Sequence, residues 1–157
     1  MNVLRILLTL SVLFFCEKAD AKGKIVLKAE MEKLQKYSGD VVINFTVVNG
    51  RNEVVYHSST VPIKDVKFFV FYPDGRKVEL TNYGKNWWSL KSGGAGNRRV
   101  ATKIEPGSSL KFSPNIGRVF DMSMGGKYVV KNSITLYDAE GKKFTVEGEN
   151  LTIEIPG

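Results

Sequence analysis

Apolar and polar residues alternate in short runs along most of the chain. In the segment DVVINFTVVN, one set of alternate positions is Val41, Ile43, Phe45 and Val47. Successive side chains of a strand point to opposite faces, so this period of two predicts a β-strand whose two faces are both partly covered. Further runs rich in β-branched and aromatic residues follow as far as NLTIEI, and such residues are typical of strands.

Turn sequences separate these runs. VKFFVFYPDGRKVEL and SITLYDAEGKKFTVEG each predict a hairpin, with PDG and AEG as the turns, and EPG supplies another turn in KIEPGSSLKF. With an opening strand in GKIVLKAEM, the chain has eight or nine strands at a spacing of roughly 8 to 12 residues, which is typical of sandwiches. We therefore expect an all-β protein, an antiparallel β-sandwich that forms one domain over residues 22–157.

One segment has a competing interpretation. In LKAEMEKLQKYSG, Leu27, Met31 and Leu34 fall at near-helical spacing, and Gly39 could cap the end of a helix. Residues 28–38 could therefore form a short helix or a long first loop.

The first 21 residues have the three-part pattern of a secretory signal peptide. Arg5 precedes an apolar run that ends at Cys16, and Ala21 closes an A-x-A cleavage site. We expect cleavage after Ala21 and a secreted or periplasmic protein. The run is shorter than the roughly 20 residues that span a hydrocarbon core, so no stable membrane span is expected. Lipoprotein processing at Cys16 is the alternative, although Phe15 stands where it requires a small side chain.

Composition narrows the chemistry of the exported domain. Cys16 is the only cysteine, so cleavage after Ala21 would leave neither disulfides nor cysteine nucleophiles. The formal net charge is +7, and the charges of the leader cancel, so the domain carries the whole excess. A basic exported domain favours acidic partners, such as an anionic glycan or an acidic protein, over nucleic acid.

Residues 41–131 resemble a known family in the order of their features. EPGSSLKF contains a PG-x-S turn (Pro106, Gly107, Ser108), and VFDMSMGGKYVV is close to the pattern YDLSxPGxYxV at Phe120, Asp121, Met122, Ser123, Gly126, Tyr128 and Val130. The segment looks like the Ig-like accessory β-sandwich of secreted bacterial and fungal proteins, including the N-terminal propeptide domain of deuterolysin-type metallopeptidases. It is similar, more distantly, to the intracellular proteinase inhibitor of bacilli. The chain contains no H-E-x-x-H motif, so the resemblance implies a fold and an accessory use, not a reaction.

The second motif also makes physical sense as a strand entry. Asp121 can accept backbone N–H groups in the turn, and Gly125 and Gly126 permit positive φ. Tyr128 can bury its ring while its hydroxyl bonds back to the corner, as in the tyrosine corner of Ig-type sandwiches.

Residues typical of enzymes are sparse. His57 is the only histidine; we expect it in a solvent-exposed loop, where its neighbour Ser58 would not form a triad with it. One histidine without cysteine predicts no zinc site and no cofactor. Asp74 and Asp138 fit turn formers better than calcium ligands. We expect no catalysis, with a hydrolase that uses two converging acids as the remaining alternative.

The best candidate binding residues lie in NYGKNWWSLKSGGAGNRR. In an extended segment, Trp87 and Trp88 would point to opposite sides, one into the core and one to solvent. Tyr83, Arg98 and Arg99 could then complete an aromatic and cationic platform for a protein or a sugar. The alternative is that both tryptophan rings pack within the molecule.

These observations predict a non-catalytic binding module that recognises a protein partner through loops, in a protease-inhibitory or chaperone-like role. A carbohydrate-binding module that uses exposed aromatic side chains is the alternative. Asn44 and Asn150 begin N-x-S/T sequons, so both are candidate glycosylation sites in a eukaryotic host.

Overall fold

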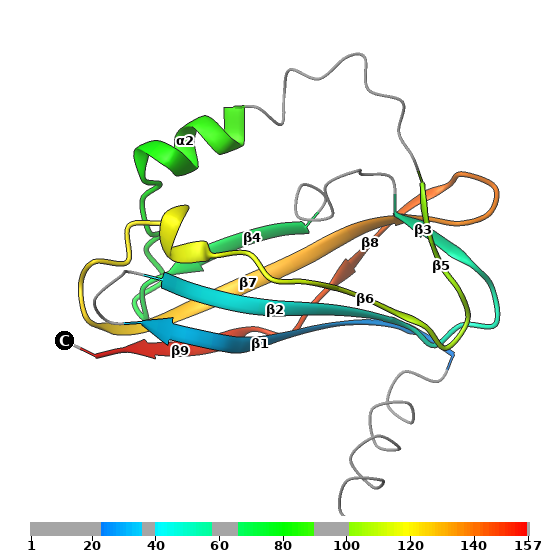
Figure 1. Cartoon of the computed structure of the whole chain (residues 1–157), viewed down its shortest axis with the longest axis horizontal. Helices are drawn as coiled ribbons and strands as arrows, with labels where there is room; N and C mark the ends of the chain where they lie inside the picture. The colour runs from blue at the N-terminus through cyan, green and yellow to red at the C-terminus, as the bar shows by residue number, and fades with distance from the viewer. Residues whose placement is uncertain (1–22, 36–39, 58–65, 90–100, 157) are drawn as a thin grey trace, which may run out of the picture.

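The computed structural model describes residues 23–35, 40–57, 66–89 and 101–156. These residues form nine strands in two antiparallel sheets, which confirms the predicted all-β sandwich (Figure 1). The predicted signal peptide with Cys16 and Ala21 lies outside the described residues, and so do Arg98 and Arg99.

The first sheet has the strand order β1-β2-β6. Its strands are β1 (Ile25–Gln35), β2 (Asp40–Asn49) and β6 (Ser109–Phe112). Along β2, buried side chains alternate with half-buried ones, and the buried set includes Val41, Ile43, Phe45 and Val47. The predicted strand with two partly covered faces is therefore confirmed.

The expectation of a short helix or long loop at residues 28–38 is wrong for its described part, because residues 28–35 belong to β1. This strand pairs with β2 from Ile25 to Gln35, and Leu27 is buried in the core. The cross-strand ladder with β2 outweighs the near-helical spacing that suggested a helix, as tertiary context commonly overrides local preference.

The second sheet is built around one long strand. Its members are β3 (Val55–His57), β4 (Val66–Phe71), β5 (Thr102–Ile104), β7 (Gly126–Tyr137), β8 (Lys143–Glu147) and β9 (Leu151–Ile155). One side of β7 pairs with β4 and, near its end, with β3, which in turn pairs with β5. The other side pairs first with β9 and then with β8, so these two short strands share one edge of the sheet.

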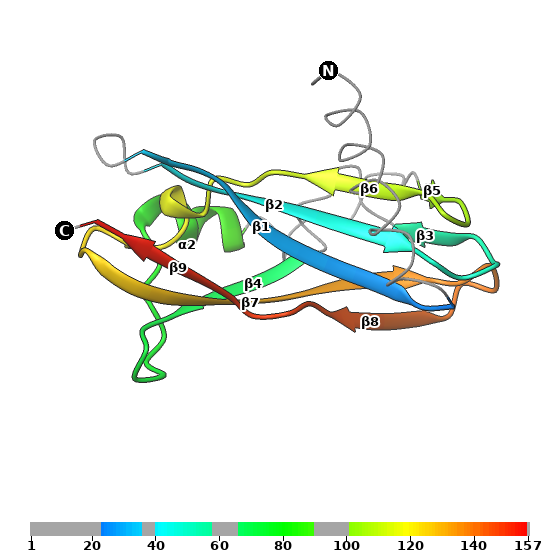
Figure 2. The same ribbon diagram turned by 90° about the horizontal axis from the view of Figure 1, so that it is seen from below.

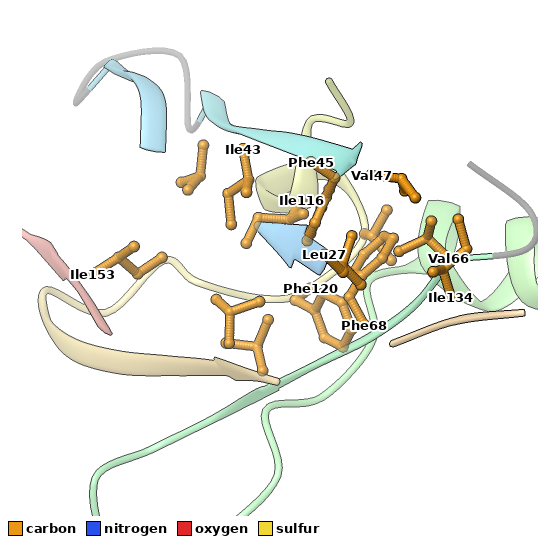
Figure 3. Packing of buried hydrophobic residues seen from close by; sticks show 14 of the residues in the cluster. Leu27, Ile43, Phe45, Val47, Val66, Phe68, Ile116, Phe120, Ile134 and Ile153 are labelled. Atoms are coloured by element: carbon orange, nitrogen blue, oxygen red, sulfur yellow. The ribbon is translucent and has the colours of Figure 1, made fainter. Parts of the chain in front are cut away.

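The two sheets pack face to face around one hydrophobic core (Figures 2 and 3). Phe45 of β2 stacks against Phe68 of β4 with ring centroids 5.9 Å apart, and against Phe112 of β6 at 5.6 Å. Aromatic contacts therefore connect the two sheets across the middle of the sandwich.

The predicted turns are confirmed by their hydrogen bonds. Asp138 accepts the N–H groups of Glu140 (3.1 Å) and Lys142 (2.8 Å) in the turn between β7 and β8. In the EPG turn, Gly107 has a φ of +74°, and the N–H of Ser108 donates to the carbonyl of Glu105 at 2.9 Å. This turn joins β5 to β6, which belong to different sheets, so it carries the chain across the sandwich.

Candidate functional site

The helix α2 (Asn82–Ser89) stands where an extended loop was expected. Thr81 caps it, since its hydroxyl oxygen accepts the N–H of Gly84 at 3.0 Å. Gly84, Trp87 and Trp88 fall at i, i+3 and i+4, so they share one face of the helix. The expectation that one tryptophan points inward and the other outward is therefore wrong, and both side chains are half-buried.

Both tryptophans pack against the core. Trp87 and Trp88 lie 5.9 Å and 6.1 Å from the ring of Phe68, and Trp88 also lies 6.3 Å from the ring of Phe120. Gly84 permits this close approach, because a Cβ atom there would stand 2.1 Å from the carbonyl oxygen of Val119. The helix is thereby fixed over the β4 side of the sandwich (Figure 1).

The predicted binding platform is not assembled by the described residues. Tyr83 is 56% exposed on α2, whereas Trp87 and Trp88 contribute to packing. Arg98 and Arg99 lie outside the described residues. A role for these five residues in binding stays a prediction.

His57 is fully buried, so the expectation of a solvent-exposed loop histidine is wrong. It is the last residue of β3 and pairs with Thr102 of β5. Because β3 extends this far, His57 points to the same side as Val55, which is also buried.

The strand entry before β7 has the predicted structure. The ring of Tyr128 is buried, and its hydroxyl donates to the carbonyl oxygen of Met124. Burial raises the pKa of Tyr128, with smaller contributions from Tyr72 and Asp121. Asp121 accepts the hydroxyl (2.7 Å) and the N–H (3.3 Å) of Ser123, and these hydrogen bonds lower the pKa of Asp121. Both residues have structural roles here.

The part of the chain that the structure describes contains no group of three or more His, Cys, Asp or Glu side chains that could hold a metal ion. Asp74 serves its turn by accepting the N–H (3.0 Å) and the Nε–H (2.7 Å) of Arg76. These hydrogen bonds, the backbone one first, lower the pKa of Asp74. Among the described helices, none is long and apolar enough to cross a bilayer.

The two sequon asparagines differ in their surroundings. Asn44 is half-buried in β2 and accepts a hydrogen bond from the hydroxyl of Ser113. Asn150 is exposed in the connection between β8 and β9. Of the two, Asn150 is the more exposed side chain.

A groove of about 510 Å³ lies between β1 and the β8–β9 connection. One wall is formed by residue 24 and residues 26–30, and the other by residues 149–151. Since alternate residues of a strand share a face, Val26, Lys28 and Glu30 of β1 form one row along the first wall, and Lys24 lies just before the strand begins. Leu151 is half-buried on the opposite wall.

The sheets meet beside this groove at Gly148. A Cβ atom at this position would stand 2.0 Å from Oδ1 of Asn132 and 3.0 Å from the carbonyl oxygen of Leu27. Asn132 is 3% exposed, and its Nδ2 donates to the carbonyl oxygen of Glu149 at 2.9 Å. The second wall is therefore tied to β7, so the groove is bounded by anchored backbone.

Comparisons with known proteins add nothing to the fold. No family model matches the chain, and no curated protein matches it. One similar solved structure is the Northeast Structural Genomics Consortium target SoR45, with 14% identity, a TM-score of 0.49, and 85% of this chain and 87% of that chain covered. Another is the putative ApaA protein from Bordetella pertussis, with 12% identity, a TM-score of 0.44, and 85% and 91% covered. Likenesses this weak carry no argument, and the resemblance to accessory sandwiches of secreted proteins stays a prediction.

Proposed function

We propose that the protein is an exported, non-catalytic binding module that holds an extended segment of a partner protein in the groove beside β1. The groove is the observation that carries this proposal, and the leader pattern supports export. The absence of catalysis is supported by the engagement of the reactive side chains in the structure. His57 lies within the core, and Asp74, Asp121 and Asp138 hold turns.

The row along β1 has the repeat of an extended peptide. Alternate residues of a strand are about 6.8 Å apart, so the side chains of Val26 and Glu30 begin about 14 Å apart with Lys28 between them, and Lys24 precedes Val26 at the start of the strand. A peptide in extended conformation has the same spacing. Acidic, apolar, acidic and basic side chains at every second position would therefore meet Lys24, Val26, Lys28 and Glu30 in turn.

The charges of this row are available to such a peptide. The ion pairs found among the described residues are Arg76 with Asp74 and Arg118 with Asp40, so neither Lys24 nor Lys28 takes part in one. Opposite charges on neighbouring strands contribute roughly 0.2–1 kcal/mol each. The pattern of charges therefore favours a peptide with acidic, apolar, acidic and basic side chains at alternate positions over a peptide in which every charge is inverted.

The alternatives have less support. A glycan site built on Tyr83, Trp87 and Trp88 would need tryptophan faces that instead pack against the core. A hydrolase would have Glu30 and Glu149 as its acids, since both line the groove. Both are exposed, whereas glycoside hydrolysis requires surroundings that keep one of the two carboxyl groups protonated.

Fluorescence anisotropy with designed peptides tests the proposal. The first labelled peptide has Glu, Val, Glu and Lys at alternate positions with Thr between them, and the second has every charge inverted; each is also made in reverse order. In one chain direction the first peptide should bind at least about tenfold more tightly than the second, the equivalent of about 1.4 kcal/mol.

The variant Lys28→Glu should weaken binding of the first peptide and strengthen binding of the second. Lys103→Glu, the same charge change on exposed β5, is the matched control. The proposal is wrong if both peptides bind equally, or if the two variants change the affinities alike.

A further inference from the structure

The outer face of the second sheet carries two phenylalanine rings beneath two lysines. Phe69 and Phe71 alternate with the buried side chains of β4, so they point away from the core and are half-buried. The ammonium nitrogen of Lys77 lies 4.0 Å from the ring centroid of Phe69, and that of Lys131 lies 5.0 Å from the centroid of Phe71. Both distances are within the range of cation–π attraction.

The two lysines approach the rings from opposite sides of β4. Lys131 is the register partner of Phe69 on β7, yet its ammonium group lies over Phe71. Lys77 is bridged to Phe71, yet its ammonium group lies over Phe69. Each side chain therefore reaches diagonally across the sheet, and the two ammonium groups come to lie over adjacent rings. Lys67, exposed two residues before Phe69, adds a third positive charge on the same face.

These positive charges are not neutralised by carboxylates within the described residues. Lys67, Lys77 and Lys131 belong to neither of the ion pairs found there. An ammonium group over a ring keeps most of its surface open to solvent and to anions. We call this surface the lysine–phenylalanine face; it consists of Lys67, Phe69, Phe71, Lys77 and Lys131. Its lysines belong to no ion pair among the described residues, and two of them lie over phenylalanine rings.

We propose that the lysine–phenylalanine face binds an acidic polysaccharide, whose carboxylate or sulfate groups pair with the three lysines. The apolar C–H surface of the sugar rings would lie against Phe71 and against the part of Phe69 that Lys77 and the ring of Trp88, 5.9 Å away, leave uncovered. A net charge of +7 adds long-range attraction for such a polymer. Lys77, Phe69 and Phe71 of this site lie on the far side of β7 from the second wall of the peptide groove, whereas Lys131 stands next to that wall, because its neighbour Val130 pairs with Leu151.

The face fits a polysaccharide better than a lipid bilayer. Membrane binding requires apolar side chains that enter the interface. The exposed large apolar side chains of the described residues are Met31, Tyr83 and Met124, and none belongs to β4 or β7. Phe69 and Phe71 are half-buried in the sheet and do not protrude.

Isothermal titration calorimetry with defined polymers tests this proposal. Polygalacturonate carries carboxylates on sugars, neutral dextran has sugars without charge, and inorganic polyphosphate has charge without sugar. We expect polygalacturonate to bind, dextran to fail, and the double variant Lys77→Gln/Lys131→Gln to weaken polygalacturonate binding about tenfold. The double variant Lys103→Gln/Lys142→Gln, with the same loss of charge elsewhere on the exposed surface, should bind as the wild type does.

A ring variant separates sugar recognition from charge alone. Phe71→Leu keeps an apolar side chain but loses the ring, so it should weaken polygalacturonate binding more than polyphosphate binding.

Equal losses for the two double lysine variants would overturn the proposal, because binding would then follow net charge. Tighter binding of duplex DNA or of anionic vesicles than of polygalacturonate, lost in Lys77→Gln/Lys131→Gln, would also overturn it. The peptide assay on the single variant Lys77→Gln, which is remote from both groove walls, should be unchanged, so failure of one proposal is distinguishable from failure of the other.

Discussion

The sandwich has two margins, one along β4 and one along β1 and the β8–β9 connection, and different kinds of side chains line them. Along β4, Lys77 and Val78 bond to the strand and α2 lies over it, with Trp87 and Trp88 packed against the core. Along β1 and the β8–β9 connection, the sheets touch at Gly148 and leave a groove of about 510 Å³ lined largely by lysine, glutamate and small apolar side chains. The large aromatic side chains close the first margin, whereas the second keeps the polar surface and the space that recognition needs.

Gly84→Ala should disturb the closed margin most. The added Cβ would stand 2.1 Å from the carbonyl oxygen of Val119, which is backbone and cannot rotate away. We expect a loss of about 3 kcal/mol in the free energy of unfolding, measured by urea denaturation. Lys85→Ala, on an exposed position of the same helix, should change it by less than about 0.5 kcal/mol. Wild-type stability in Gly84→Ala would show that α2 is not held against Val119.

Trp88→Ala tests whether the tryptophan closes the margin or binds a partner. Removal of a half-buried ring that contacts Phe68, Phe69 and Phe120 should lower the free energy of unfolding by about 2–3 kcal/mol. Tyr83→Ala, which removes an exposed ring from the same helix, should leave stability within about 0.5 kcal/mol of wild type. A Trp88→Ala variant that keeps wild-type stability but no longer binds a partner protein would support the binding role expected for Trp88 from the sequence.

Gly148→Ala probes the open margin. The new Cβ would stand 2.0 Å from Oδ1 and 2.8 Å from Cγ of Asn132, a side chain that would have to move, and 3.0 Å from the carbonyl oxygen of Leu27. We expect a loss of about 1–2 kcal/mol, smaller than in Gly84→Ala, together with weaker binding of the acidic peptide, because the second wall moves. Thermal denaturation and the anisotropy assay measure the two effects. A loss equal to that of Gly84→Ala would mean that both margins are packed alike.

Tyr128→Phe should have the smallest effect on the free energy of unfolding. Tyr128 lies in β7, the strand that pairs with β4 on one side and with β9 on the other. Loss of the hydrogen bond to Met124 should cost about 1 kcal/mol at neutral pH. The folded-state pKa of Tyr128 is raised above 10.0, so above this pH the unfolded chain releases a proton that the folded protein retains. The free energy of unfolding should therefore fall as pH rises through the folded pKa, and less so in Tyr128→Phe. Identical alkaline slopes in urea denaturation would contradict this.

Local signals of the sequence were sufficient for most of the strands, the turns and the corner, but not for the second half of β1 or for β3. The glycines and aspartates of the turns specify their own backbone through φ and short hydrogen bonds, as in Gly107 and Asp138. Likewise, Asp121 and Tyr128 bond within a few residues of themselves. Such features do not depend on which strands become neighbours, so they can be predicted from one sequence.

Features that depend on distant neighbours were not predicted. The helix α2 has a capping residue, Thr81, and an i, i+3, i+4 spacing of Gly84, Trp87 and Trp88. These features alone do not distinguish a helix from a loop, because the helix also depends on the contact with Val119. The burial of His57 follows from pairing with β5, which lies far along the chain. The groove joins opposite ends of the sequence, and no local pattern marks it.

The exposure of Asn150 ties the open margin to the biology of its host. This asparagine lines the groove and begins a sequon, so an oligosaccharide attached there would stand in the space proposed for the peptide. The protein would then have the same fold in every host. It would differ in peptide binding between a glycosylating cell and a bacterium. The variant Asn150→Gln, which removes the sequon, would keep this space open in either host.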